Sequence, residues 1–244
     1  MQSSPSPLTS GTQLFIRYAF APNKLRYCGP SDNRAVFDYF INQKDDERLM
    51  KLLSKFEGAY PYLQYIAFKN KINDPFDERV VEAYWIGNAL LNCISINDYH
   101  NYLKNRFKGQ WDKKAFDMIF SSSIYSAKPH HSFHVLSGFA KKNISDKTLE
   151  FIRNCMINTG KVKAIQKDNI AIISKELICK DNKLYYWKSI DKTIDYSDSF
   201  LPNIQIGDTI SYHWNWVCDK LQDLEAKRLD GWNRYHINIF NHII

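Results

Sequence analysis

The hydrophobic pattern of the chain changes its period near residue 155, and this change most constrains the fold. Before that point apolar residues recur at spacings of three and four, as in Leu49, Leu52, Leu53 and Phe56, which is typical of one helix face. Beyond it, short segments alternate with period two, which is typical of β-strands. The sequence therefore predicts an α+β protein in which a helical part precedes a sheet.

Helix-start signals and apolar spacing place several helices in the first part. Asp74 is a suitable N-cap and Pro75 a suitable first helical residue, so a helix is predicted to begin there. Other helices are predicted around 35–41 and 49–56 and over 97–107, 112–121, 130–141 and 145–154. Because no strand pattern occurs before residue 155, this part is expected to be an all-α bundle.

Tight-turn sequences separate the predicted strands of the second part. Lys167-Asp168-Asn169 lies between apolar segments at 162–165 and 170–173, and Asp181-Asn182 precedes a strand over 183–187. A further strand is predicted over 209–214. Short strands of this kind favour a small closed barrel, since closure removes exposed strand edges. From Cys218 onward the helical period returns and predicts a C-terminal helix.

These patterns predict two domains and a tail. Residues 1–12 are polar, with neither the basic region nor the apolar region of a secretory signal, and are expected to be disordered. A helical domain is predicted over 13–150. A barrel with its C-terminal helix is predicted over 153–244.

Composition excludes several classes of protein. The 15 Tyr, 15 Phe and 6 Trp among 244 residues argue against disorder, and no apolar run reaches the roughly 18–20 residues of a membrane span. Five widely spaced cysteines without a CxxC pair favour reduced thiols and a cytoplasmic location. The net charge of +7 is spread along the chain, and no phosphate-binding loop, nucleophile elbow or dinucleotide fingerprint occurs. Nucleotide-dependent enzymes and hydrolases are therefore disfavoured.

Two segments of the barrel part resemble a known family. Cys-Met-Ile-Asn-Thr-Gly-Lys-Val at 155–162 places Cys155 five residues before Gly160, and Gly-Asp-Thr-Ile-Ser-Tyr-His at 207–213 places His213 six residues after Gly207. Together with the Lys-Leu pair at 220–221, this pattern resembles the HypC/HupF family of [NiFe]-hydrogenase maturation chaperones. Thr159 stands where that family has proline, and its cysteine is normally near the N-terminus rather than internal.

The resemblance implies a fold, a cargo and partners. It implies an OB-like barrel whose Cys155 binds the Fe(CN)2(CO) unit together with a HypD-like scaffold, before delivery to a hydrogenase large-subunit precursor. The chain is then a chaperone or carrier and not a catalyst. The segments at 56–63, 74–85 and 129–135 are similar to a bacterial family of unknown function, which implies no activity.

Cys155 and His213 form the main candidate site. A thiolate is a natural ligand for soft iron, and an imidazole is suited either to bind the metal or to orient the thiolate. We therefore expect both side chains to face the same open space. The alternative is that Cys155 is a small core residue and His213 a half-exposed strand residue.

A histidine cluster supplies a second hypothesis. His130, His131 and His134 share a helix face, and imidazoles at such spacing bind Zn²⁺, Ni²⁺ or Fe²⁺. Position 131 is His and not Glu, so the zincin motif is absent. The cluster favours either a metalloenzyme with the barrel as a specificity module or simply buried, hydrogen-bonded imidazoles.

Aromatic residues of the barrel support a third hypothesis, an OB-like single-stranded nucleic-acid binder. Such folds stack bases on aromatic side chains in a basic groove. The aromatics concerned are Tyr185, Tyr186, Trp187, Tyr212, Trp214 and Trp216. The same residues are also what the interior of a small barrel needs. Elsewhere, Tyr27-Cys28-Gly29-Pro30 is expected to be a loop that carries a thiol without a neighbouring base.

Overall fold

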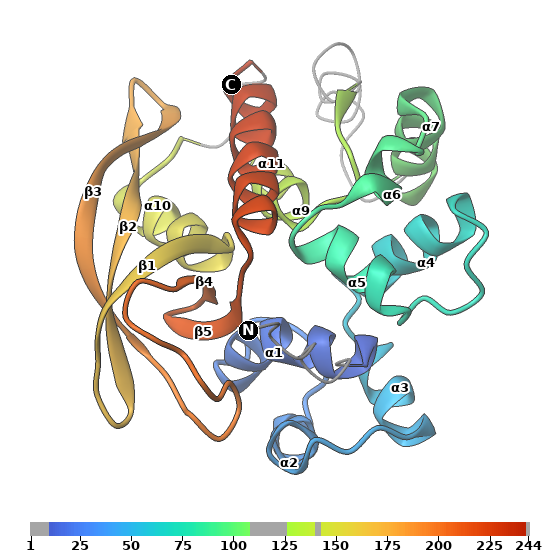
Figure 1. Cartoon of the computed structure of the whole chain (residues 1–244). Coiled ribbons are helices and arrows are strands. Elements are labelled where there is room, and N and C mark those ends of the chain that lie inside the picture. The colour runs from blue at the N-terminus through green and yellow to red at the C-terminus, as the bar shows by residue number, and fades with distance from the viewer. Residues whose placement is uncertain (1–9, 108–125, 140–142, 243–244) are drawn as a thin grey trace.

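The computed structural model describes residues 10–107, 126–139 and 143–242. The helices in these ranges are α1 (Gly11–Lys24), α2 (Asn33–Asn42), α3 (Glu47–Leu53), α4 (Tyr60–Lys69), α5 (Glu78–Trp85), α6 (Ala89–Asn92), α7 (Ile96–Phe107), α9 (His131–Ser137), α10 (Asp146–Cys155) and α11 (Asp223–Asn241). The strands are β1 (Asn158–Ile165), β2 (Asn169–Lys180), β3 (Lys183–Asp195), β4 (Thr209–His213) and β5 (Trp216–Lys220). The predicted α+β class, with a helical part before the sheet and a helix at the end, is confirmed (Figure 1).

The five strands are joined in the order β1-β2-β3-β5-β4, and pairing of β4 with β1 closes the barrel. All neighbours are antiparallel except β3 and β5, which meet in parallel at Asp195 and Trp216. The barrel interior is apolar and is filled by Val162, Ile170, Ile172, Ile194, Tyr196, Ile204, Ile210, Tyr212 and Val217. Inward and outward residues alternate along β1 and β2, which explains the period of two in the sequence.

Helix α1 is central to the helical part, although the sequence analysis predicts no helix there. Its N-cap is Ser10, whose Oγ accepts a hydrogen bond from the Gln13 N–H at 3.3 Å. The helix contacts α2, α5, β4 and β5, so nearly all its sides are buried. The helix begins inside the range 1–12 that the sequence analysis assigns to a polar tail, and Gln13 and Arg17 interrupt its apolar residues.

A disordered tail is predicted over residues 1–12, of which residues 1–9 lie outside the described part of the chain. Within the described part, however, α1 already begins at Gly11, so the last two residues of that range are helical and buried. The packing surface of α5 explains this early start, because Gly11 lies against the backbone of Phe76 and Glu78. The predicted helix over 112–121 also lies outside the described residues.

Two predicted boundaries are wrong. The helix expected from Pro75 begins only at Glu78, because Asp77 caps it through Arg79, whereas Asp74 accepts from Phe76 within a turn. The helical period read from Cys218 onward begins at Asp223, because residues 216–220 pair with β4 as strand β5. That pairing is a contact between distant residues, and the apolar spacing alone does not reveal it. The remaining helices lie within a few residues of their predicted positions.

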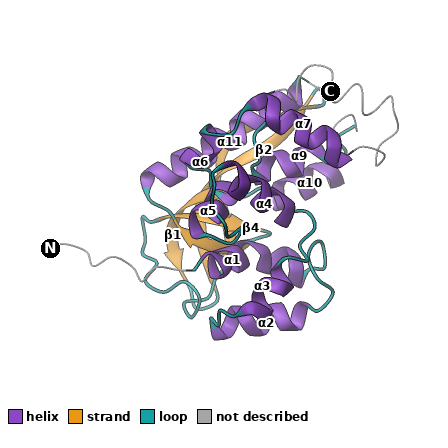
Figure 2. Cartoon of the chain, turned by 90° about the vertical axis from the view of Figure 1, so that its right-hand side faces the viewer, coloured by secondary structure: helices purple, strands orange, loops and turns teal. Residues whose placement is uncertain are grey.

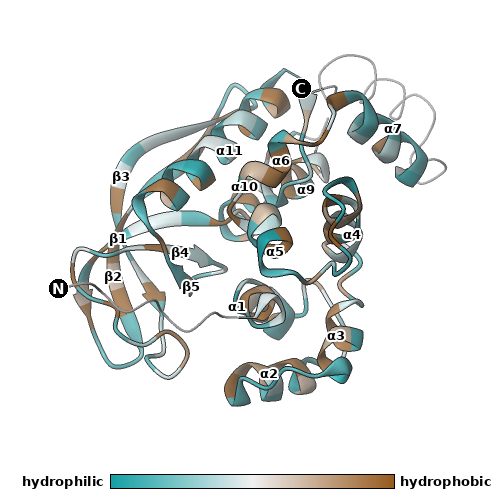
Figure 3. Ribbon diagram, turned by 45° about the vertical axis from the view of Figure 1, so that its right-hand side comes forward, coloured by the Kyte–Doolittle hydropathy of each residue, from teal (hydrophilic) through white to brown (hydrophobic). Residues whose placement is uncertain are grey.

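Helix α11 lies between the barrel and the helical part. It packs against α9 on one side and against β1, β3 and β4 on the other (Figure 1). The view from the side shows the other helices in front of the sheet (Figure 2). Hydrophobic and hydrophilic residues alternate around α1, α2 and α11 (Figure 3), as the packing of helices on a core requires.

The apolar core is continuous across the predicted domain boundary. The largest cluster of buried residues combines helices α1–α7 with Ile157, Cys218, Leu221, Leu229 and Ile239 from the second part. The division into 13–150 and 153–244 stays a prediction, since shared packing does not by itself define folding units. Within the described ranges, no helix combines the length and apolarity needed to cross a membrane.

Candidate metal site

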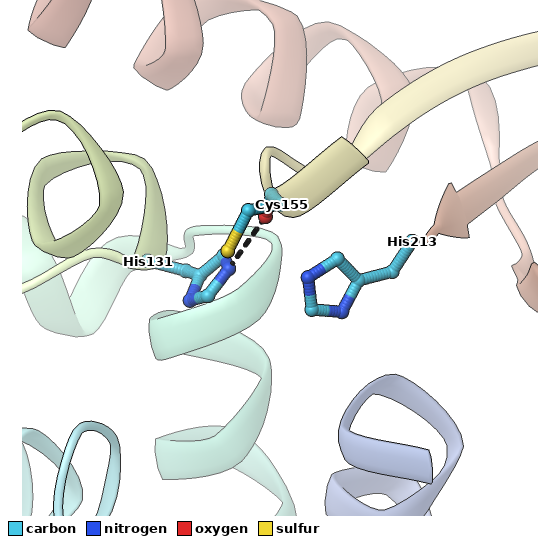
Figure 4. A group of neighbouring side chains, drawn as sticks. All are labelled: His131, Cys155 and His213. Atoms are coloured by element: carbon cyan, nitrogen blue, oxygen red, sulfur yellow. Dashed lines mark hydrogen bonds between the residues drawn. The ribbon is translucent and has the colours of Figure 1, made fainter. Parts of the chain in front are cut away.

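Three side chains from separate elements meet between the barrel and the helices. Cys155 ends α10, His213 ends β4 and His131 begins α9. The sulfur and one nitrogen of each imidazole all lie within 4.8 Å of one another (Figure 4). The structure thus places Cys155 and His213 side by side and adds His131 from the predicted histidine cluster. The expectation that both side chains face an open space is wrong, because His213 is 1% exposed and packed between the barrel and the helices.

Local backbone structure brings the ends of α10 and β4 together. After Cys155 the chain leaves the helix, with Met156 in an extended conformation, and enters β1. The Trp214 N–H donates to the Asn154 carbonyl at 2.9 Å, which ties the end of β4 to the end of α10. Trp214 and Asn215 adopt positive φ angles and form the two-residue turn into β5. His213 is therefore held directly beside Cys155.

The imidazole of His213 presents a free lone pair. The ring is only 1% exposed, and its Nδ1–H donates to the Tyr18 carbonyl of α1 at 2.7 Å. This bond assigns the proton to Nδ1. The Nε2 atom is buried and forms no hydrogen bond among the described residues, although the Cys155 carbonyl is near enough to raise the pKa of the ring. A buried acceptor without a partner is costly, and a metal ligand oriented by a backbone carbonyl has this arrangement.

His131 is hydrogen-bonded on both sides. Its Nε2 donates to the Cys155 carbonyl at 2.9 Å, so its Nδ1 accepts from the Tyr84 hydroxyl at 3.2 Å. To bind a metal, the ring exchanges one of these bonds for the coordination bond. The Tyr84 hydroxyl is able to accept as well as donate, so it supports either tautomer. Tyr84 is therefore placed to orient His131 in both states.

Burial keeps the three groups uncharged at neutral pH. It lowers the pKa of His213 to about 4, against the opposing influence of the Tyr18 and Cys155 carbonyls. It lowers the pKa of His131 well below its ordinary value, with the nearby imidazoles acting in the same direction. Burial raises the pKa of the half-buried Cys155 thiol to about 12. The imidazoles are ready to bind a cation, whereas the thiol must lose its proton to do so.

Aromatic side chains surround the group and limit its contact with water. The Trp85 ring lies 4.7 Å from the His131 ring and 6.1 Å from the His213 ring, measured between centroids. Trp85 in turn stacks on Tyr18, which holds His213. Sequence reasoning missed these supporting residues. The signal available for Tyr18 was the largely apolar character of 14–21, in which Arg17 is the one charged residue.

The donor set matches a transition metal. One sulfur and two nitrogens suit Zn²⁺, Fe²⁺, Ni²⁺ or copper, and not Mg²⁺ or Ca²⁺. In a tetrahedral site with ordinary bond lengths the donors are about 3.3–3.6 Å apart. The observed upper limit of 4.8 Å means that donor–donor distances shorten by up to about 1.2–1.5 Å on binding.

The other two histidines of the predicted cluster are not part of this group. The Nδ1 atom of His130 lies 2.8 Å from the Ser132 hydroxyl, which in turn is 2.8 Å from Nδ1 of His236. His134 packs edge-on against Tyr62, and its ring is 6.1 Å from that of His131. The structure therefore does not bring His130, His131 and His134 together as three ligands of one metal, because His130 is the N-cap of α9 and points elsewhere.

Most barrel aromatics considered for nucleic-acid binding are packed inside the molecule. Tyr212 is buried and fills the barrel, and Trp214 and Trp216 pack against the helical core. Tyr186 is half-buried, with the Arg234 guanidinium over its ring. Only Tyr185 and Trp187 of the six are exposed. This distribution favours their role in packing.

Comparison with known proteins gives one match. No curated protein and no solved structure matches the chain. A model of a family of unknown function, DUF6390, matches residues 7–244. The predicted similarity of the N-terminal part to a family of unknown function is confirmed, and the match continues through the barrel and α11. The chain therefore belongs to the family of unknown function DUF6390.

Proposed function

We propose that this protein binds a transition-metal ion through Cys155, His213 and His131. The observation that carries the proposal is the convergence of one sulfur and two imidazole nitrogens from α10, β4 and α9 within 4.8 Å. The unpartnered Nε2 of His213 supports it further. Three protein donors leave coordination positions for other ligands, which suits a carrier that takes up and releases its cargo.

We expect the purified, reduced protein to bind one Co²⁺ or Zn²⁺ per chain. Replacing Cys155 by serine should weaken Zn²⁺ binding at least about tenfold and reduce the thiolate-to-cobalt absorption, because the soft ligand is lost. The measurement is a spectroscopic Co²⁺ titration with Zn²⁺ competition against a chelator. The matched control is Cys93→Ser, which alters an exposed thiol outside the group. Equal binding by the wild type and Cys155→Ser would contradict the proposal.

The resemblance to HypC/HupF chaperones supports a more specific proposal about which metal the protein carries. We propose that the protein is an accessory chaperone of [NiFe]-hydrogenase maturation, with Cys155 presenting its thiolate to iron of an Fe(CN)2(CO) unit. Its partners are then a HypD-like scaffold or a hydrogenase large-subunit precursor. The support is that Cys155 and His213, the two residues which that resemblance singles out, are neighbours within one site. Iron with cyanide and carbonyl ligands is a soft centre for which a thiolate is suited.

Co-purification tests this narrower proposal. We expect the protein isolated with either partner to show infrared bands in the cyanide and carbonyl stretching region, and Cys155→Ser to lose them. Cys93→Ser should retain them, because that thiol does not belong to the group. Absence of association with both partners contradicts the role in hydrogenase maturation. Metal binding by Cys155, measured independently by the cobalt titration, does not depend on this outcome.

A further inference from the structure

The loop between α1 and α2 lies against the elements that carry the metal site. The Tyr27 ring stacks on Trp214 at 4.1 Å with an interplanar angle of 16°, and meets Phe151 edge-on at 5.5 Å. Trp214 directly follows His213, and Phe151 precedes Cys155 by one turn of α10. The residue after Tyr27 is Cys28, so this contact brings a second thiol to the same side of the site.

The loop has a defined conformation at Cys28. The Nδ2 atom of the buried Asn23 donates to the Cys28 carbonyl at 2.9 Å and to the Pro30 carbonyl at 3.0 Å. Gly29 has a φ of +86°, and a Cβ there would lie 2.3 Å from the Phe56 ring. Only glycine therefore fits at this position without displacing a core aromatic residue. These contacts hold the backbone of Cys28 in place.

The contacts of Tyr27 with Trp214 and Phe151 place the neighbouring Cys28 beside the two elements that carry His213 and Cys155. The Cys28 thiol is the strongest charged influence on the pKa of Cys155, and both thiols act on the Tyr84 hydroxyl that supports His131. Surrounding protein atoms raise the pKa of Cys28 itself to about 12, although the residue as a whole is exposed. Cys28 does not belong to the group within 4.8 Å, so its sulfur must approach on binding.

A second anionic ligand would balance the charge of the metal-bound site. A divalent cation with one thiolate and two neutral imidazoles keeps a net charge of +1 in a largely buried place, which is unfavourable without a counter-charge. No carboxylate is among the groups that shift the pKa values of Cys155, His131 and His213 within the described part of the chain. A second thiolate would make the site neutral.

We propose that Cys28 is the fourth protein ligand, so that the cation is held by two cysteines and two histidines. This inference rests on the metal site proposed above. The set is one of the common tetrahedral donor combinations for Zn²⁺ and similar cations. Because Cys28 is exposed while His131 and His213 are buried, the loop lies on the solvent side of the site. Movement of the Cys28 sulfur would then open or close access to the metal.

Cobalt absorption of the full-length, phosphine-reduced protein tests this assignment. Charge-transfer intensity reports the number of bound thiolates, so Cys28→Ser should retain about half of the wild-type intensity, one thiolate of two. Its affinity for Zn²⁺ should fall at least about tenfold. Cys93→Ser, also an exposed thiol, should match the wild type in both measurements. Thermal unfolding of the metal-free variants checks that each is folded.

The results separate this inference from the metal site itself. If Cys28→Ser retains the full cobalt intensity and Zn²⁺ affinity while Cys155→Ser loses them, Cys28 is not a ligand and the three-residue site stands. If the wild type binds no cobalt, both proposals are wrong. A loss of half the intensity in each single cysteine variant, with no loss in Cys93→Ser, establishes two thiolate ligands.

Discussion

Replacing Gly87 by alanine is expected to lower the free energy of unfolding by about 3 kcal/mol. Gly87 lies between α5 and α6 with a φ of +90°, which alanine adopts only with strain. A Cβ there would also lie 2.1 Å from Cδ1 and 2.3 Å from Nε1 of Trp232 on α11. The indole cannot retreat easily, because the His130 and His236 rings are packed beside it, with centroids at 6.1 and 5.8 Å.

Urea unfolding followed by circular dichroism measures this effect, and α11 offers a matched control. Gly231 precedes Trp232, is exposed, and would have no atom within 4 Å of an added Cβ. Gly231→Ala should therefore stabilise the protein by about 0.5–1 kcal/mol, because alanine is the better helix former. A loss below about 1 kcal/mol for Gly87→Ala would show that α11 docks less closely on the α5–α6 connection.

The metal-free protein is expected to lose about 4–5 kcal/mol of stability between pH 6 and pH 5. Burial lowers the pKa of His130 to about 3 and those of His134 and His213 to about 4, and it also lowers those of His131 and His236. These imidazoles gain a proton in the unfolded state near pH 6.5 but stay neutral in the native state. The stability they contribute is therefore present above pH 6.5 and is lost as the pH falls toward 4.

Other titrating groups do not cancel this loss of stability at falling pH. Burial raises the pKa of Asp219 to about 6, so this carboxyl favours the native state at low pH and acts in the opposite direction. Burial also raises the pKa of Glu82, but both carboxyls are partly exposed beside an arginine, so their influence is smaller. The pKa values of Asp46 and Asp77 are lowered, so these carboxylates affect stability only below about pH 4.

Urea unfolding at pH 7.5, 6.0 and 5.0 in the presence of a chelator measures the loss. The variant His134→Gln removes one titrating group whose side chain is half-buried, and it should reduce the slope by up to about 1 kcal/mol per pH unit. A free energy of unfolding that stays constant from pH 7.5 to 5.0 would show that these imidazoles are hydrated in the native state.

The candidate site shows which features could be predicted from the sequence. Cys155 and His213 were identified through segments whose spacing resembles a known family, and the structure places them side by side. His131 was identified as a metal ligand too, but with His130 and His134 as its partners. Helical spacing shows which residues share a face, but it does not show which other element that face meets. The contact of α9 with the end of α10 therefore had to come from the structure.

The fold, too, has features that the sequence predicts and features that only the structure shows. The order of helical part, sheet and C-terminal helix follows from the hydrophobic period, which is a local property of the chain. Helix α1 was missed because it begins within the polar range 1–12, and Gln13 and Arg17 interrupt its apolar residues. Strand β5 was assigned to the following helix because Cys218 and Leu221 fit a spacing of three. Its pairing with β4 is a contact that the spacing of apolar residues does not reveal.

The sequence by itself determined the succession of elements and the kinds of side chain available for chemistry. Periodicity, caps and turns act over a few residues, so they can be recognised in the chain alone. Only the tertiary structure decided that a sulfur from α10 and imidazoles from β4 and α9 converge, with α1 orienting His213 through Tyr18. Such convergence depends on how buried faces pack against one another, and many arrangements of the same elements are compatible with one hydrophobic pattern.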